Sequence, residues 1–462
     1  MNVQLIFKEK PLHLFGFPLL FIVNHFFAIV TNTTLQPFLL WWGLNFLSAV
    51  TLCSALTWLA CWILSFYFNK TKSAILSTIL FLPFFFFQDV FLSLHSTSFF
   101  GLRARWAVPA LAIALIAIIY LISRSNKPFR SLNQYLNLVS ILLVAYTGIT
   151  LILSFDRLKP KVLNYSPQPR ELTCINCPDV YLFVLDSYTS NKSLEDYFQF
   201  ENSDFTNKLK NLSFEVAEQA ESDYALTQYS VASILNFNEI KDLKDYNSGL
   251  SAVIQNSAVT ESFKKSEYSI NNYSLFQIDD QPPYYSITAD VSIGFINGVI
   301  HYSIFNLFYD VILKNTIYET HENILNRINE HSEENGKPDF VYAHLFAPHP
   351  PFVIDKNGQE INFFKQTKSF NNKAAYISQV EGINKMIFST IKKVRQSSPN
   401  AIIIIMGDHG YRYLDGDPNQ GKESYTVFLA YHGPNQTQLN QLKSSNDIFN
   451  LIFKNQIQGQ PK

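Results

Sequence analysis

Apolar residues without charge dominate the first third of the chain. No Asp, Glu, Lys or Arg occurs in residues 11–69, 106–123 or 131–155. A helix needs about 20 apolar residues to cross a membrane core of about 30 Å, so these runs indicate membrane spans rather than buried helices of a large soluble protein. We predict five spans in a membrane domain of residues 1–156, at residues 12–31, 38–67, 74–96, 106–123 and 133–154.

Basic residues in the short loops set the expected orientation, because Lys and Arg collect on the cytoplasmic side of a membrane. With a cytoplasmic N-terminus, the inner loops hold seven basic residues and the outer loops before residue 157 hold two. An odd number of spans then places the remaining chain outside the cytoplasm, as in a bacterial inner or plasma membrane. The inner residues are Lys8, Lys10, Lys70, Lys72, Arg124, Lys127 and Arg130, and the outer ones are Arg103 and Arg105.

Asp89 is the one acidic residue within the predicted spans. A carboxylate inside a membrane is a functional candidate by default, because its burial there is costly. Asp89 follows the Phe-rich run FLPFFFFQ close to the end of its span. That position favours an interfacial residue over a role in transport.

The rest of the chain has the composition of a soluble domain. The whole chain has 36 Lys and Arg against 37 Asp and Glu, and this near-neutral balance argues against nucleic-acid binding. A Pro-containing linker, residues 157–178, precedes a domain at residues 179–462. The linker contains Cys174 and Cys177 as a CxxC pair. One pair does not complete a four-Cys zinc site, so we expect a local disulfide in an oxidising compartment.

Strand-like apolar runs alternate with helical patterns in this domain. Strands separated by helices predict βα units, and therefore an α/β domain with a mostly parallel sheet sandwiched by helices. The predicted strands are Val180–Asp186, Asp339–Pro348, Ala401–Asp408 and Tyr425–Pro434. The predicted helices are Asn202–Leu212, Ala258–Ser266, Ile317–Glu330 and Lys373–Gln396.

Residues that could bind a metal stand at the ends of two of these strands. Asp186 ends the first, and Asp408 and His409 end the run AIIIIMGDHG. In parallel sheets, function collects at the carboxyl ends of strands. Carboxylate and imidazole groups there are suitable ligands for a divalent metal. An Asp at a strand end is more often a turn or cap residue, but Asp408, His409 and Gly410 in succession make a more specific signal.

Four segments together resemble the alkaline phosphatase and sulfatase superfamily. They are DVYLFVLDSY, DYALTQYSVASILN, HLFAPHPPF and IIIIMGDHGYR, in the family's order within residues 178–435. The chain is most similar to the membrane-anchored branch of lipoteichoic acid synthases and phosphoethanolamine or phosphoglycerol transferases. That resemblance implies an alkaline-phosphatase-like fold and about five N-terminal spans before an extracytoplasmic, sulfatase-like catalytic domain.

The resemblance also assigns roles to residues. Asp186, Asp408 and His409 would be metal ligands, and Thr227 would be both the nucleophile and a ligand. The residues themselves support Thr227, because TQYSVASILN reads as the start of a short helix, where backbone N–H groups favour phosphate. A simple Thr N-cap is the alternative, and Ser230 and Ser233 are weaker nucleophile candidates.

Two histidines belong to the segment HLFAPHPPF: His344 lies within the predicted strand Asp339–Pro348, and His349 directly follows it. The resemblance assigns His349, in the HPP element, to binding or protonating the phosphate-bearing substrate, which an imidazole can do. His344 is a second candidate for substrate binding, with a structural histidine as the equal alternative.

Departures from the wider superfamily narrow the chemistry. Thr227 lacks the C/S-x-P-x-R context of formylglycine sulfatases, because Gln228 and Tyr229 follow it. Asp186 is followed by Ser187 rather than by a second carboxylate. We therefore expect one divalent metal ion, zinc or manganese, with magnesium as a third option.

These observations predict metal-dependent transfer of a phosphoryl-linked head group from a membrane lipid to an envelope glycan or lipid acceptor, through a phospho-threonine intermediate. A membrane-bound phosphodiesterase or sulfatase-like hydrolase on the same site is the second reading, and a non-catalytic binding relative is the third. No motif identifies the head group, the acceptor or an oligomeric state. Residues 275–312 are a candidate substrate wall or membrane contact.

Overall fold

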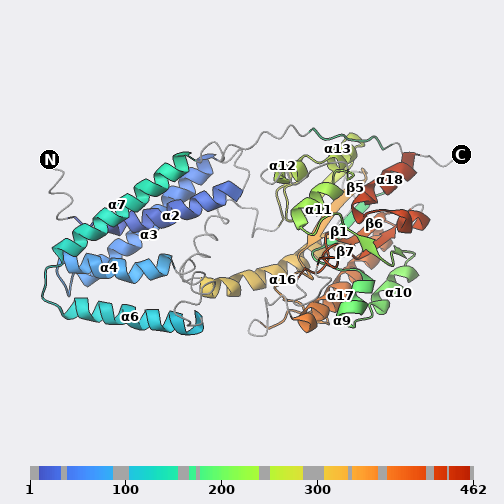
Figure 1. The fold of residues 1–462 in the computed structure, drawn as a ribbon. Coiled ribbons are helices and arrows are strands. Elements are labelled where there is room, and N and C mark those ends of the chain that lie inside the picture. Colours follow the sequence, from blue (N-terminus) through green and yellow to red (C-terminus); the bar gives the residue numbers. More distant parts are fainter. Residues whose placement is uncertain are drawn as a thin grey trace. The chain divides into compact units, whose positions relative to one another are not determined.

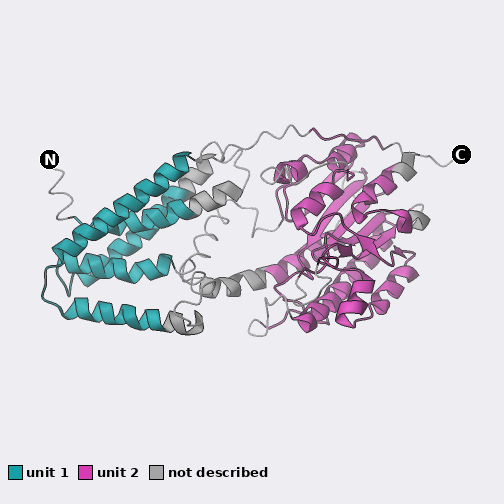
Figure 2. Ribbon diagram, in the orientation of Figure 1, with its two compact units in different colours: residues 1–161, 290–310 teal, residues 162–289, 311–462 magenta. Residues whose placement is uncertain are grey.

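The chain forms two compact units in a computed structural model of residues 1–462. One unit comprises residues 1–161 and 290–310, and the other comprises residues 162–289 and 311–462 (Figure 2). The structure describes residues 10–32, 39–86, 104–153, 166–172, 177–238, 250–284, 306–330, 336–362, 372–412, 421–433 and 436–457.

Long helices make up the described part of the first unit. Two stretches, Phe46–Leu64 and Arg130–Leu153, are long and apolar enough to cross a membrane by length and composition. The third predicted span is only partly described, because residues 87–103, which include Asp89, lie outside the described residues. Five spans therefore stay a prediction. The helices are α2 (His13–Asn32), α3 (Leu39–Leu64), α4 (Lys70–Phe85), α6 (Ala104–Arg124) and α7 (Arg130–Leu153).

In the first unit, many apolar side chains are exposed and several polar side chains are buried, the reverse of the arrangement in a soluble protein. Large apolar side chains such as Trp62 and Ile152 are more than half exposed. In the interior, the buried His13 ring contacts the Thr78 hydroxyl at 2.7 Å and Asn133 Oδ1 at 3.0 Å. Extensive exposed apolar surface is rare on soluble monomers, whereas hydrogen bonds between helices are common inside membranes. The described helices thus have surfaces suited to lipid.

A six-stranded mixed sheet lies at the centre of the second unit, in the order β2-β8-β6-β1-β5-β4. The strands β4, β5, β1 and β6 run parallel, and β8 is antiparallel to both of its neighbours, β6 and β2. A separate pair joins β3 and β7. The strands are β1 (Val180–Leu185), β2 (Glu215–Val216), β3 (Ala220–Glu221), β4 (Ser269–Tyr273), β5 (Asp339–Leu345), β6 (Ile402–Gly407), β7 (Thr426–Val427) and β8 (Leu429–His432).

Helices cover both faces of this sheet (Figure 1). The central strands β1, β5 and β6 are buried along their whole length, which explains their continuous apolar runs. Side chains alternate between two hydrophobic cores, so Tyr181 and Phe183 join one core and Leu182 and Val184 join the other. Four helices contribute side chains to the first core: α9 (Asn191–Phe198), α10 (Ser203–Asn211), α16 (Asn306–Glu330, by its described side chains) and α17 (Lys373–Ser397). Four others contribute to the second core: α11 (Thr227–Ile234), α12 (Leu250–Gln255), α13 (Ala258–Lys265) and α18 (Ile448–Ile457). Two 3-10 helices, η3 (Gln436–Gln441) and η4 (Ser445–Asp447), precede α18.

The predicted sheet between helices is present, but several elements differ from the prediction. The segment Tyr425–Pro434 forms two short strands, β7 and β8, instead of one, and β2 and β3 were not predicted. The strand β4 was not predicted, because SINNY lies at a sheet edge, is only partly buried and has no apolar run. Helix α16 begins at Asn306 rather than at Ile317. Cys177 is disulfide-bonded, whereas Cys174 lies outside the described residues.

Candidate active site

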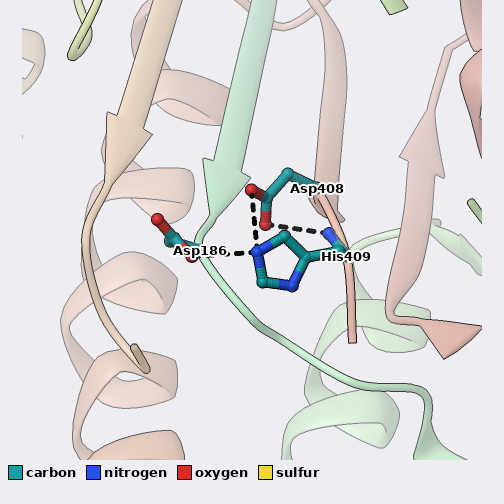
Figure 3. Close-up of side chains that lie close together, drawn as sticks. All are labelled: Asp186, Asp408 and His409. Atoms are coloured by element: carbon teal, nitrogen blue, oxygen red, sulfur yellow. Dashed lines mark hydrogen bonds and ion pairs between the residues drawn. The ribbon is translucent and has the colours of Figure 1, made fainter. Parts of the chain in front are cut away.

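Strand register brings two carboxylates together at one edge of the sheet. The strands β1 and β6 are parallel neighbours with Leu185 opposite Gly407, so Asp186 and Asp408 leave the sheet side by side. One ligand atom each from Asp186, Asp408 and His409 lies within 4.8 Å of the other two, and all three residues are buried. Figure 3 shows the imidazole of His409 facing both carboxylates.

The hydrogen bonds of His409 determine which ring nitrogen faces this cluster. Nδ1 lies 2.8 Å from the Gly410 carbonyl, which can only accept, so Nδ1 carries the proton. The lone pair of Nε2 is therefore directed at Asp186 Oδ1 and Asp408 Oδ2, each at 3.6 Å. Fixing the tautomer through the other ring nitrogen is typical of histidines that bind metals.

Burial and neighbouring charges shift the two carboxylates in opposite directions. Burial, and then the charge of Asp408, raise the pKa of Asp186. Burial alone would also raise the pKa of Asp408, but the neighbouring His409 and His344 and the Ser187 N–H outweigh it, so this pKa lies below its usual value. Asp408 is thus the anion of the pair, and Asp186 lacks a neighbouring charge strong enough to offset its burial.

Two buried polar atoms at the cluster, Asp408 Oδ2 and His344 Nε2, lack hydrogen-bond partners among the described residues. His344 Nε2 lies 3.9 Å from Asp186 Oδ2, too far for a hydrogen bond. Buried polar atoms normally have partners. Carboxylate oxygens and imidazole nitrogens gathered in this way are suitable donors for a divalent metal ion.

Thr227 is the first residue of α11, and its side chain reaches the cluster. Its Oγ1 lies 3.3 Å from His409 Nε2. The N-cap position belongs to Leu226, and no side chain caps the helix, so Thr227 is not the simple N-cap that was the alternative. The serines Ser230 and Ser233 are almost completely buried and bond to Asp408 O and Asn238 Oδ1, respectively. Their hydroxyls are therefore occupied within the fold.

The two predicted substrate histidines differ in their contacts. His344 is fully buried, and its Nδ1 lies 3.0 Å from the Tyr342 hydroxyl. His349 Nδ1 donates to the Pro350 carbonyl at 2.6 Å. Burial lowers the pKa of each ring to about 4. His344 borders Asp186, and the charge of Asp408 acts on His349.

Two further residues were not identified from the sequence. Gln379 holds the His349 loop, since its Nε2 donates to His349 O at 2.9 Å and its Oε1 accepts from Val353 N and Ile354 N. The charge of Arg412 lowers the pKa values of both Asp186 and His349. For Gln379, the available signal in the sequence was its position as a lone amide within the apolar pattern of α17. For Arg412 there was only its position after the motif GDHGYR.

Gly382 allows α17 to approach the same loop. A Cβ at this position would lie 2.1 Å from Asp355 O and 2.6 Å from Ile354 Cγ2. Replacing a helical Gly with Ala usually stabilises by about 1 kcal/mol, but this contact reverses the sign. We expect Gly382→Ala to destabilise by about 2 kcal/mol, measured as a lower unfolding midpoint of the detergent-solubilised protein. Gly148→Ala is the control, because no atom lies within 4 Å of its Cβ; a Gly382→Ala midpoint at or above wild type would contradict the expected clash.

Several solved structures resemble this chain at low similarity. No curated protein sequence matches the chain. Similar solved structures include the periplasmic domain of EcEptC from Escherichia coli in complex with Zn, at 14% identity and a TM-score of 0.37, covering 60% of this chain and 79% of that one. The integral membrane lipooligosaccharide phosphoethanolamine transferase A from Neisseria meningitidis has 12% identity, a TM-score of 0.36, and coverages of 93% and 89%. The lipoteichoic acid synthase LtaP from Listeria monocytogenes has 16% identity, a TM-score of 0.33, and coverages of 56% and 66%.

The family model named Sulfatase matches residues 221–454. The matched segment begins just before Thr227, includes His344, His349, Asp408 and His409, and extends into α18. The similarity to the solved structures is low, so the family assignment depends on the match to this family model, which covers half of the chain. The chain belongs to the sulfatase family of enzymes, as the four sequence motifs predicted.

Proposed function

We propose that this chain transfers a phosphoryl-linked head group from a membrane lipid to an envelope glycan or lipid, and that Thr227 carries the group between the two. The observation that supports this most directly is the position of the Thr227 hydroxyl. It lies at the start of α11 and 3.3 Å from His409 Nε2, beside the buried Asp186 and Asp408. A hydroxyl at such a site has the surroundings that a phosphoryl-accepting nucleophile needs.

Asp186, Asp408 and His409 would hold one divalent ion, zinc or manganese, with magnesium as a third option. Such an ion lowers the pKa of a hydroxyl and stabilises negative charge on phosphoryl oxygens. The Thr227 hydroxyl loses its proton to water as its oxygen attacks phosphorus and forms a new O–P bond, while the bond from phosphorus to the lipid oxygen breaks and that oxygen gains a proton. His349 Nε2 supplies this proton only after taking one up from water, because the ring proton is on Nδ1, which donates to Pro350 O, and burial lowers the ring pKa to about 4. An acceptor hydroxyl then attacks phosphorus and loses its proton, the bond from phosphorus to Thr227 Oγ1 breaks, and Thr227 regains a proton.

We also propose that residues 1–156 form five membrane spans, with residues 157–178 as a linker and residues 179–462 outside the cytoplasm. The exposed apolar and buried polar side chains of the first unit support a membrane location. The basic loops support the orientation. A reporter fused after Lys161 is expected to be active only as an extracytoplasmic reporter, and cytoplasmic activity would overturn this topology.

A hydrolase is the second candidate. The family model is named Sulfatase, and sulfatases are hydrolases. In a hydrolase, the same Thr227 intermediate would react with water instead of an acceptor. The distinction lies in the second half of the reaction. If the phospho-threonine form decays at the same rate with and without envelope glycans and lipids, the enzyme is a hydrolase. If an added acceptor accelerates the decay and gains the group, it is a transferase.

Mass spectrometry of the whole protein tests the proposal. The full-length protein is loaded with zinc or manganese and incubated with vesicles of phosphatidylethanolamine, phosphatidylglycerol or total membrane lipid. We expect a metal-dependent mass increase that maps to the peptide containing Thr227, with the added mass identifying the head group. An EDTA-treated sample should show none. Metal-loaded protein that forms no adduct and releases no lipid alcohol with any of these vesicles would overturn the catalytic function and favour the binding relative.

A further inference from the structure

A buried cluster of hydroxyl and amide side chains lies behind the helix that carries Thr227. All of its members are at most 4% exposed, although their side chains are polar. They come from three segments: the residue after β3, helix α11, and the region of η4 near the C-terminus. The members are Ser222, Ser230, Ser444 and Asn446.

Ser230 connects α11 to the ligand strand. Its Oγ donates to the backbone carbonyl of Asp408 at 2.5 Å. Ser230 is three residues after Thr227, and residues three apart share one face of a helix. One face of α11 therefore makes two contacts in succession: Ser230 bonds to Asp408, and Thr227 reaches His409 Nε2 at 3.3 Å.

Asn446 fixes the other side of this arrangement. Its Oδ1 accepts from Ser222 Oγ at 3.0 Å and from Asp223 N at 3.1 Å. Its Nδ2 donates to the backbone carbonyl of Ser230 at 3.2 Å. One amide thus connects the segment that enters α11 with the first turn of the helix.

We propose that Ser230 and Asn446 are positioning residues, which hold the Thr227 hydroxyl at reacting distance from the ion held by Asp186, Asp408 and His409. This inference depends on the proposed function, because it assigns the distance between its nucleophile and its ligands. Neither residue supplies a side-chain ligand to the cluster. Their loss is therefore expected to separate metal binding, which survives, from reaction of Thr227, which slows.

Two serine substitutions in the same helix test this. Ser230→Ala removes the bond to Asp408 O, whereas Ser233→Ala removes a bond of the same kind to Asn238 Oδ1, away from the cluster. Each replaces a serine that is at most 1% exposed. We expect Ser230→Ala to slow formation of the Thr227 adduct about 50-fold, because small misplacements of reacting groups cost up to about 100-fold. Ser233→Ala should slow it less than threefold, and both should keep the wild-type zinc content. Asn446→Ala should resemble Ser230→Ala.

A spectroscopic measurement tests the same distance without turnover. In a Thr227→Cys background loaded with Co²⁺, a thiolate that reaches the ion gives a charge-transfer absorption band. We expect this band to weaken at least twofold when Ser230→Ala is added and to stay unchanged with Ser233→Ala. The binding constant for Co²⁺ should change less than threefold in both.

The outcomes separate this inference from the proposed function. If neither the wild-type adduct nor the Thr227→Cys band forms, the proposed nucleophile is wrong. If both form, and Ser230→Ala and Ser233→Ala give equal rates and equal bands, the positioning role is wrong while the proposed function stands. Loss of the metal from Ser230→Ala would also overturn it, since Ser230 would then support the ligands rather than the nucleophile.

Discussion

Replacing Thr227 with Ala is expected to lower the rate of head-group transfer by about 10⁴-fold, the largest effect of any single substitution in this chain. The Thr227 hydroxyl is the nucleophile in the proposed reaction, and removing a covalent nucleophile typically costs 10⁴-fold or more. This loss corresponds to about 5.5 kcal/mol of activation free energy. The measurement is the rate of lipid alcohol release from vesicles, together with the mass of the protein after a single turnover.

Three comparisons make this result specific. Thr227→Ser keeps a hydroxyl at the start of α11 and should retain at least a tenth of the activity. The exposed neighbour Gln228, replaced by Ala, should leave the rate within twofold. Thr227→Ala should bind zinc in wild-type amount, because the Asp186, Asp408 and His409 side chains are unchanged. Transfer by Thr227→Ala at more than a tenth of the wild-type rate would exclude it as the nucleophile.

The sequence could predict the cluster of Asp186, Asp408 and His409 because the fold brings its members together through local rules. Continuous apolar runs predicted β1 and β6, and each is followed by its ligand. Parallel pairing of Leu185 with Gly407 then places Asp186 beside Asp408, although 221 residues separate Ser187 from Asp408. A strand, its end and a parallel neighbour are enough for that prediction.

The supporting residues could not be predicted in this way. Asn446 bonds to Ser222 over a separation of 224 residues, and Gln379 reaches His349 from within a long helix. In the sequence both are ordinary amides, and such residues usually mark solvent-exposed positions. Their burial follows from the packing of whole elements, which hydrophobic periodicity does not specify. Arg412 is similar, since only the folded loop brings its charge into range of Asp186.

Asp408→Asn is expected to change activity and stability in opposite directions. The substitution removes an anionic ligand, and we expect transfer to fall about 10³-fold, because a ligand that stabilises transition-state charge in a dry site contributes several kcal/mol. In metal-free protein, however, the charge of Asp408 is one of the causes that raise the pKa of the buried Asp186, so it makes ionisation of Asp186 more costly. A neutral amide of the same shape removes that cost.

The hydrogen bonds around Asp408 explain why the amide is tolerated. Asp408 Oδ1 accepts from Ser187 N at 3.0 Å and from His409 N at 2.8 Å, and an Asn oxygen can accept both. The Asn Nδ2 then replaces Oδ2, which lies 3.6 Å from His409 Nε2 and lacks a hydrogen-bond partner among the described residues. In the variant, the N–H group of the amide side chain therefore faces the lone pair of His409 Nε2, in place of the negatively charged Oδ2 of Asp408. We therefore expect metal-free Asp408→Asn to unfold about 3 °C above metal-free wild type, as for a gain of about 1 kcal/mol.

Adding metal should reverse this order, and that reversal is the decisive measurement. A ligand that binds only the folded state stabilises it in proportion to the logarithm of its concentration over its dissociation constant. Saturating zinc should therefore raise the unfolding midpoint of wild type well above that of Asp408→Asn, which has lost a ligand. Asp204→Asn is the matched control, because Asp204 is 81% exposed and pairs only with Lys208 among the described residues. If Asp408→Asn were less stable than wild type without metal, the carboxylate would be structural, and no metal would be needed to explain its charge.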